Sequence, residues 1–202
     1  RALPRFLKAR ELVTGGAGGA IGDLRFVEIL LTQPLQIHPV DQLPWRLRPE
    51  ISGGGLFVDL ASHTLDFLDY LLGPVQEVRG FSHNQSGVYP VDDIVSAAFK
   101  FEHGVQAMGT WSFSSFESAD RITFVGAGGR VTLSTFGIEP VLLETPAGRQ
   151  VFDLPNPPHI QQPLIQQVVD ELLGLGTCVS TGASALRTTW VMEQLLNTKK
   201  SA

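Results

Sequence analysis

The chain has 202 residues, of which 43% are hydrophobic, and it carries 15 Lys and Arg against 20 Asp and Glu. This length suits one compact domain with a sizeable core, and the net charge of −5 argues against the basic surface that nucleic-acid binding requires. No apolar run reaches the roughly 18 residues of a membrane span, and a single cysteine, Cys178, excludes an internal disulfide and a cysteine-based zinc site. We expect no nucleic-acid partner, no membrane partner, no metal and a cytoplasmic location.

The first part of the sequence predicts two helices and one strand. Apolar residues recur at helical spacing over residues 4–13, whereas residues 23–33 are rich in β-branched and large apolar side chains, which is typical of a strand. Residues 34–52 hold four prolines and little periodicity, so we expect a long irregular loop. A helix over residues 56–72, bounded by glycines at both ends, is the clearest element.

The rest of the sequence predicts a sheet followed by two helices. Short β-prone runs between residues 75 and 154 alternate with turn signals, and connections this short cannot hold crossover helices. Amphipathic helices are expected over residues 159–173 and 183–197. The fold class is therefore α+β, with a large, mostly antiparallel open sheet and helices packed on one face.

The uncovered face of this sheet is expected to bind a second copy of the chain. In the run at residues 105–113, small and apolar side chains occupy both sides of the predicted strand. An apolar sheet face that no helix covers suits a sheet-to-sheet contact. We therefore expect a homodimer or a larger oligomer that forms through the exposed sheet face.

Two glycine-rich segments imitate nucleotide-binding loops. Residues 12–22 resemble the cofactor loop of short-chain dehydrogenases, but a dinucleotide loop follows a strand and opens a helix, which is the reverse of the pattern here. The Tyr-x-x-x-Lys pair of those enzymes is also missing. Residues 125–129 are explained better as a hairpin turn. A short-chain dehydrogenase built on Gly15 to Gly22 remains a third hypothesis, against which the predicted hairpins argue.

The helix over residues 56–72 carries a polar stripe. A rotation of about 100° per residue places Asp59, His63, Asp66 and Tyr70 on one side, while apolar residues cover most of the rest. An imidazole one turn from a carboxylate on each side can act as a general acid or base near neutral pH. From periodicity alone, a stripe that simply faces water explains the pattern better. The other histidines, in a loop, at strand ends and turns and at a helix start, are interpreted as surface or structural residues.

The segment from Trp45 to Asp66 resembles the central signature of a known family. In it a Trp-Arg pair precedes three glycines and a helix with the pattern Asp-x-x-x-His. This is similar to the glucose-fructose oxidoreductase, inositol dehydrogenase and rhizopine-catabolism (GFO/IDH/MocA) family of oxidoreductases. The likeness spans essentially the whole chain, because it continues at residues 1–6, 91–93 and 111–113 and in the closing helices.

The resemblance implies a two-domain parent enzyme that acts on a sugar, a polyol or a related hydroxy or keto compound. An N-terminal Rossmann domain would bind NAD or NADP, and residues 1–202 would form the substrate-side C-terminal domain, of the glyceraldehyde-3-phosphate dehydrogenase-like kind. The histidine that matches His63 would exchange a proton with substrate while hydride moves to or from the nicotinamide, and Asp59 would assist. Trp45, Arg46 and Arg1 would line the cleft near the substrate.

The sequence departs from the family pattern in one respect. The Rossmann fingerprint and the family's Glu-Lys-Pro motif are absent from residues 1–202. We therefore expect the chain alone to bind no cofactor and to be inactive. The alternative hypothesis is a non-catalytic domain that keeps the family fold for dimerisation or ligand binding.

Overall fold

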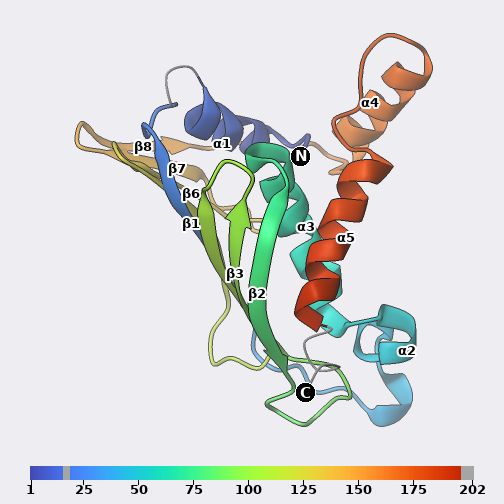
Figure 1. The fold of residues 1–202 in the computed structure, drawn as a ribbon. Helices are drawn as coiled ribbons and strands as arrows, with labels where there is room; N and C mark the ends of the chain where they lie inside the picture. Colours follow the sequence, from blue (N-terminus) through green and yellow to red (C-terminus); the bar gives the residue numbers. More distant parts are fainter. Residues whose placement is uncertain (16–18, 197–202) are drawn as a thin grey trace.

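The computed structural model describes residues 1–15 and 19–196, with one central sheet and helices on one of its faces (Figure 1). The helices are α1 (Pro4–Thr14), α2 (Pro49–Ser52), α3 (Gly55–Leu72), α4 (Gln162–Leu172) and α5 (Gly182–Leu196), with short 3₁₀ turns at Val40–Gln42 and Trp45–Leu47. The strands are β1 (Leu24–Thr32), β2 (Val75–His83), β3 (Ile94–Phe101), β4 (Gln106–Ser112), β5 (Ala119–Gly126), β6 (Arg130–Leu133), β7 (Val141–Thr145) and β8 (Gly148–Phe152).

The strands of the described residues form one mixed sheet in the order β2-β3-β4-β1-β5-β6-β7-β8. β1 runs parallel to β4 and antiparallel to β5, and the other neighbours pair antiparallel. The mostly antiparallel sheet expected from the sequence is therefore corrected to a mixed sheet. The expectation rested on short connections between consecutive strands, but a long connection that contains α3 separates β1 from β2, so chain order did not indicate the partner of β1.

The segment at residues 34–52 differs from the irregular loop that we expected. It contains two 3₁₀ turns and the four-residue helix α2. Pro39 and Pro44 stand immediately before the two turns, and Pro49 is the first residue of α2. Because proline has a fixed φ close to the helical value and lacks an N–H, it suits the start of a helical turn. The prolines therefore divide the segment into short turns.

α3 begins and ends at glycines whose backbone conformations favour glycine. Gly55 has a φ of 72°, and a Cβ at this position would lie 2.9 Å from the Cβ of Val91. Gly73, which ends the helix, has a φ of 81°. Both values lie in the left-handed region, where a side chain adds strain. These two glycines therefore fix where α3 begins and ends.

The apolar side of α3 packs on the inward face of the sheet. Phe57 meets Trp111 of β4 edge to face, with ring centroids 5.3 Å apart, and Phe67 meets Phe124 of β5 at 6.2 Å. All four rings are buried, and burial of a large apolar side chain contributes about 1.5–3 kcal/mol. α1 lies against β6 and β7, and α5 packs against α3 and β2 (Figure 1). Asp59, His63 and Asp66 of α3 keep contact with solvent on the side away from the sheet, whereas Thr64 and Asp69 are buried.

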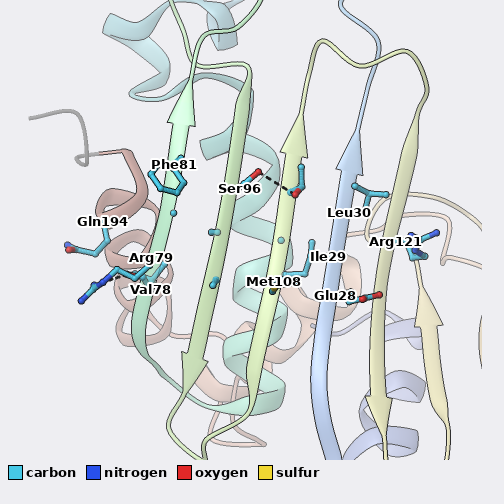
Figure 2. A pocket seen from close by; sticks show the side chains of 15 residues that line it. Glu28, Ile29, Leu30, Val78, Arg79, Phe81, Ser96, Met108, Arg121 and Gln194 are labelled. Atoms are coloured by element: carbon cyan, nitrogen blue, oxygen red, sulfur yellow. Dashed lines mark hydrogen bonds between the residues drawn. The ribbon is translucent and has the colours of Figure 1, made fainter. Parts of the chain in front are cut away.

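The other face of the sheet is open, with the helices behind it (Figure 2). Phe81 of β2 is 83% exposed on this face, and Met108 of β4 is 65% exposed. A shallow hollow of about 890 Å³ lies over β1 to β4, beside the charged side chains of Glu28, Arg79 and Arg121. The structure thus has the exposed face with apolar residues that the pattern at residues 105–113 predicted.

α4 stands apart from the core. None of its residues is buried, and it projects from the body of the domain (Figure 1). Its apolar side chains include Leu172, which is 82% exposed. Neither α4 nor any other helix in residues 1–15 and 19–196 is both long and apolar enough to cross a membrane.

Asp93 fixes the turn between β2 and β3. Its buried carboxylate accepts hydrogen bonds from the backbone N–H groups of Gln85 (2.7 Å) and Ser86 (2.9 Å). Burial acts to raise the pKa of Asp93, but the hydrogen bonds together outweigh it and hold the pKa below its ordinary value. Such a group stabilises the fold above its ordinary pKa, and the stabilisation is lost as the pH falls through the lower pKa of the folded state.

We predict that Asp93→Asn lowers the free energy of unfolding at neutral pH by about 1–2 kcal/mol, because a neutral amide accepts these hydrogen bonds less strongly. The gap between wild type and variant should narrow as the pH falls below about 4, the ordinary pKa of aspartate, and should close only below the lower pKa of the folded state. Urea unfolding at a series of pH values measures the gap. A gap that stays constant over the whole series would contradict a role for the charge.

Candidate active site

The polar side of α3 borders a groove on the helix-covered side of the domain. The groove has a volume of about 530 Å³ and is lined by residues of α1, α3 and α5, of the turn after β6 and of the segment before α4. His63 is exposed in it, and Asp66 is partly buried. The groove therefore brings together segments from the start, the middle and the end of the chain.

Arg46 and Asp59, both singled out in the sequence, are bonded to each other. Arg46 Nε donates a hydrogen bond of 2.5 Å to Asp59 Oδ2, and its guanidinium lies 4.6 Å from the centroid of the Trp45 ring. Asp59 is 21% exposed and Arg46 is 42% exposed, so both remain accessible. The pair joins the 3₁₀ turn at Trp45–Leu47 to the first half of α3 and gives the Asp59 carboxylate a fixed direction.

Arg1 is held in a buried position. Its guanidinium donates two hydrogen bonds to Asp66, of 2.6 and 2.5 Å, and a third to the carbonyl oxygen of Val179 at 2.7 Å. The Arg1 side chain is 3% exposed. Arg1 therefore fixes Asp66 and the connection between α4 and α5, and the contact with substrate expected for Arg1 stays a prediction.

Asp69 and Arg187 form a second bidentate pair that the sequence did not indicate. Arg187 of α5 donates to both carboxylate oxygens of Asp69, each at 2.7 Å, and the bonded carboxylate raises the pKa of the Arg187 guanidinium. Asp69 is buried and is also 3.6 Å from Arg1. The two residues are 118 positions apart in the chain, so no local pattern connects them. The pair fastens α5 to α3 beside the groove.

His63 is the titratable residue of the stripe that stays free of polar contacts. It makes no hydrogen bond or ion pair with the residues that the structure describes, so neither Asp59 nor Asp66 holds its ring. Its ring contacts Phe136, in the turn after β6, with centroids 5.4 Å apart and an interplanar angle of 84°. Both imidazole nitrogens are therefore available to a molecule bound in the groove.

A smaller cavity lies next to Arg46. It has a volume of about 200 Å³ and is bounded by the segment at residues 33–47 and by the turn between β2 and β3. Its polar lining includes Gln33, Gln36, His38 and Tyr89. Tyr89 donates to the carbonyl oxygen of Gln36 and accepts from the N–H of His38, so it closes one side. Of the predicted site residues, Arg46 thus lines this cavity, His63 and Arg1 line the groove, and Asp59 and Trp45 line neither.

The two glycine-rich segments that resemble nucleotide-binding loops in sequence do not have the structural context of such a loop. The glycine segment at residues 15–22 leads into β1, as we expected from the sequence, although residues 16–18 lie outside the described residues. The glycines at residues 126–129 connect β5 to β6. Neither segment opens a helix, which a pyrophosphate site requires. In the same described ranges, no three side chains of His, Cys, Asp or Glu lie close enough together to hold a metal ion.

We predict that Asp69→Ala destabilises the fold by about 2 kcal/mol, because it removes charged hydrogen bonds and leaves part of the Arg187 charge uncompensated. Glu77→Ala is the matched control, since Glu77 bonds Lys100 on an exposed part of the sheet. An exposed ion pair contributes little, so this variant should unfold close to wild type. Chemical denaturation compares the three proteins, and equal losses for both variants would contradict a special role for Asp69.

The sequence matches the GFO/IDH/MocA C-terminal domain over residues 6–132. Oxidoreductase P35 of Formosa agariphila is 30% identical over 200 residues, which are 98% of this chain and 60% of that protein. Aldose-aldose oxidoreductase from Caulobacter crescentus, complexed with glycerol, has a TM-score of 0.80 at 21% identity, over 98% of this chain and 59% of its own. An oxidoreductase from Agrobacterium radiobacter, in complex with NAD+, L-tartaric acid and magnesium, has a TM-score of 0.76 at 17% identity, over 98% and 60%.

The two structural likenesses show a shared fold, and the chain spans about 60% of the length of the relatives it matches. The family match covers more than half of the chain and includes the signature segment from Trp45 to Asp66. The resemblance inferred from that segment is confirmed. The chain belongs to the GFO/IDH/MocA family of oxidoreductases, and it carries that family's C-terminal domain.

Proposed function

We propose that the chain is the substrate-side domain of an NAD(P)-dependent oxidoreductase that acts on a sugar, a polyol or a related hydroxy or keto compound. The observation that carries the proposal is the exposed His63 ring in the groove, with no polar partner among the described residues. The name of the aldose-aldose oxidoreductase relative supports a carbohydrate substrate. The NAD+ in the complex of the Agrobacterium radiobacter oxidoreductase supports a nicotinamide cofactor.

In this proposal His63 exchanges the proton of the reaction. When an alcohol is oxidised, the imidazole of His63 would accept the hydroxyl proton, and the nicotinamide bound by the parent enzyme would supply the acceptor for the hydride, so that a carbonyl group remains. Imidazole suits this role because its ordinary pKa lies close to neutral pH. Asp59, directed by Arg46, would accept a hydrogen bond from a substrate hydroxyl, and Trp45 and Arg1 would complete the cleft.

The cofactor belongs, in the same proposal, to a Rossmann domain outside residues 1–202. The support is that neither the glycine segment at residues 15–22 nor that at residues 125–129 opens a helix, and that the chain spans only about 60% of the length of its relatives. The chain alone should then show no turnover and no binding of NADH or NADPH. We also propose a cytoplasmic location, for which the buried free thiol of Cys178 is the only support.

We predict that His63→Ala lowers kcat of the full-length gene product by about 10²- to 10⁴-fold, because general acid–base catalysis contributes a factor of that order. His103→Ala is the matched control, since His103 lies in the exposed turn between β3 and β4. Steady-state assays with NAD+ and NADP+ and a panel of aldoses and polyols measure the effect. Wild-type kcat in His63→Ala would remove the proposed role of His63.

A role in self-association is the second candidate, and the open sheet face supports it. Phe81 and Met108 line this face and are 83% and 65% exposed. Phe26, two residues before Glu28 on β1, points to the same face by strand alternation and is 41% exposed. This is a large apolar content for a surface in water. We propose that two copies pack through this face, in a homodimer or a larger oligomer. The non-catalytic alternative keeps this contact alone, without the chemistry at His63.

We predict that Met108→Asp, alone or combined with Phe81→Asp, converts the oligomer to a monomer, because a buried carboxylate without a partner is costly. Leu172→Asp is the matched control, because Leu172 is 82% exposed on α4, away from the open face. Sedimentation velocity gives the oligomeric state of each protein. A monomeric wild-type protein would contradict the proposed contact.

A further inference from the structure

The turn at residues 134–137, which follows β6, is hydrogen-bonded to a carboxylate of the neighbouring strand β5. Asp120, on β5, accepts hydrogen bonds from three consecutive backbone N–H groups, those of Thr135 (2.9 Å), Phe136 (2.7 Å) and Gly137 (3.0 Å). Hydrogen bonds to an ionised carboxylate are among the stronger ones in proteins. Three of them on adjacent residues leave the backbone of this turn little freedom.

Two further elements bind the same turn. Arg5 of α1, a buried side chain, donates to the carbonyl oxygen of Gly137 and to Asn156 Oδ1, the latter at 2.9 Å. Thr64, the residue after His63 on α3, shares a buried hydrogen bond of 3.1 Å with the hydroxyl of Thr135. The turn is therefore fixed to α1, α3 and β5 at a point directly beside His63.

This arrangement determines where the Phe136 ring lies. Thr135 is buried and points to α3, whereas Phe136 is 41% exposed and its ring contacts the His63 ring. Both rings line the groove of about 530 Å³. A substrate carbon that reaches His63 would therefore lie against the Phe136 ring. An apolar ring face accommodates C–H groups of a sugar or polyol and disfavours an anionic group, because the ring face carries negative charge density.

We infer that Phe136 is a specificity-determining residue that lines the groove beside His63. Asp120 is the positioning residue that holds the Phe136 ring against the His63 ring. The role of Phe136 in substrate specificity rests on the proposed function. The position of the Phe136 ring, however, depends only on the fold. It can be tested without an assay of activity.

The first experiment detects the contact between the two rings in the full-length protein. With ¹³C-labelled His and Phe rings, an NOE between His63 and Phe136 is expected in the wild type, and Phe136→Leu assigns it by its loss. Asp120→Asn should lose the NOE although both rings are present, because an amide offers one acceptor oxygen where the carboxylate offers two.

Asp93→Asn is the matched control, since Asp93 also accepts backbone N–H groups of a turn, at the loop between β2 and β3. It should keep the NOE. A wild-type NOE in Asp120→Asn, or an equal loss in both variants, would overturn the positioning role of Asp120.

The second experiment measures kcat and KM for D-glucose, D-xylose and myo-inositol with NAD+ and NADP+. Phe136→Leu should raise KM by about tenfold for the preferred sugar, which corresponds to the loss of one aromatic contact. Phe136→Tyr keeps the aromatic ring and should have the wild-type KM. Asp120→Asn should raise KM to about the same extent as Phe136→Leu. Wild-type KM in Phe136→Leu would overturn the specificity role.

The outcomes separate this inference from the proposed function. If His63→Ala is inactive and Phe136→Leu keeps the wild-type KM, the specificity role of Phe136 is wrong and the proposed function stands. If the full-length protein turns over none of these compounds, the sugar substrate and the specificity role both fail. The NOE comparison then decides the positioning role of Asp120 by itself.

Discussion

The paired carboxylates on the outer side of α3 determine how the rest of the domain is arranged around that helix. Asp59, Asp66 and Asp69 are each bonded to an arginine from another segment: the turn before α2, the start of the chain and α5. A carboxylate that is withdrawn from water is stable only when it is paired, so each pair also fixes a neighbouring segment to α3. His63 lies among these carboxylates and is left open to the groove.

Much of the fold was predictable because local chemistry determines it. Gly55 and Gly73 end α3 in conformations that favour glycine, and the alternating pattern of β4 places Trp111 inward and Met108 outward. The position of β1 was not predictable in the same way. The partners of β1, which are β4 and β5, lie far along the chain and are determined by tertiary packing. The residue pattern of a single strand does not show whether the strand pairs parallel or antiparallel. The sheet is therefore mixed where local reasoning expected it to be mostly antiparallel.

The site likewise contains some residues that the sequence predicted and others that it did not. The helical period placed Asp59 and His63 on the exposed side of α3, and the family signature pointed to Arg46, which contacts Asp59. Sequence reasoning could not find Asp120, which acts through backbone N–H groups of another turn, or Phe136, which meets His63 only after the sheet and α3 have packed. Contacts of this kind leave no spacing in the chain, so they become visible only in three dimensions.

The central place of β1 has a consequence for how the chain folds. β2, β3 and β4 form one set of local hairpins, and β5 to β8 form another, but β1, from near the start of the chain, lies between the two sets. Until β1 is inserted, β4 and β5 are both free edges, which can pair with the wrong strand or with another molecule. Joining the sets requires contacts between residues about 80 positions apart, such as Phe26 with Gln106. The insertion of β1 between β4 and β5 is therefore expected to limit the folding rate of this domain. Until β1 is inserted, chaperones and other unfolded chains can bind the free edges of β4 and β5.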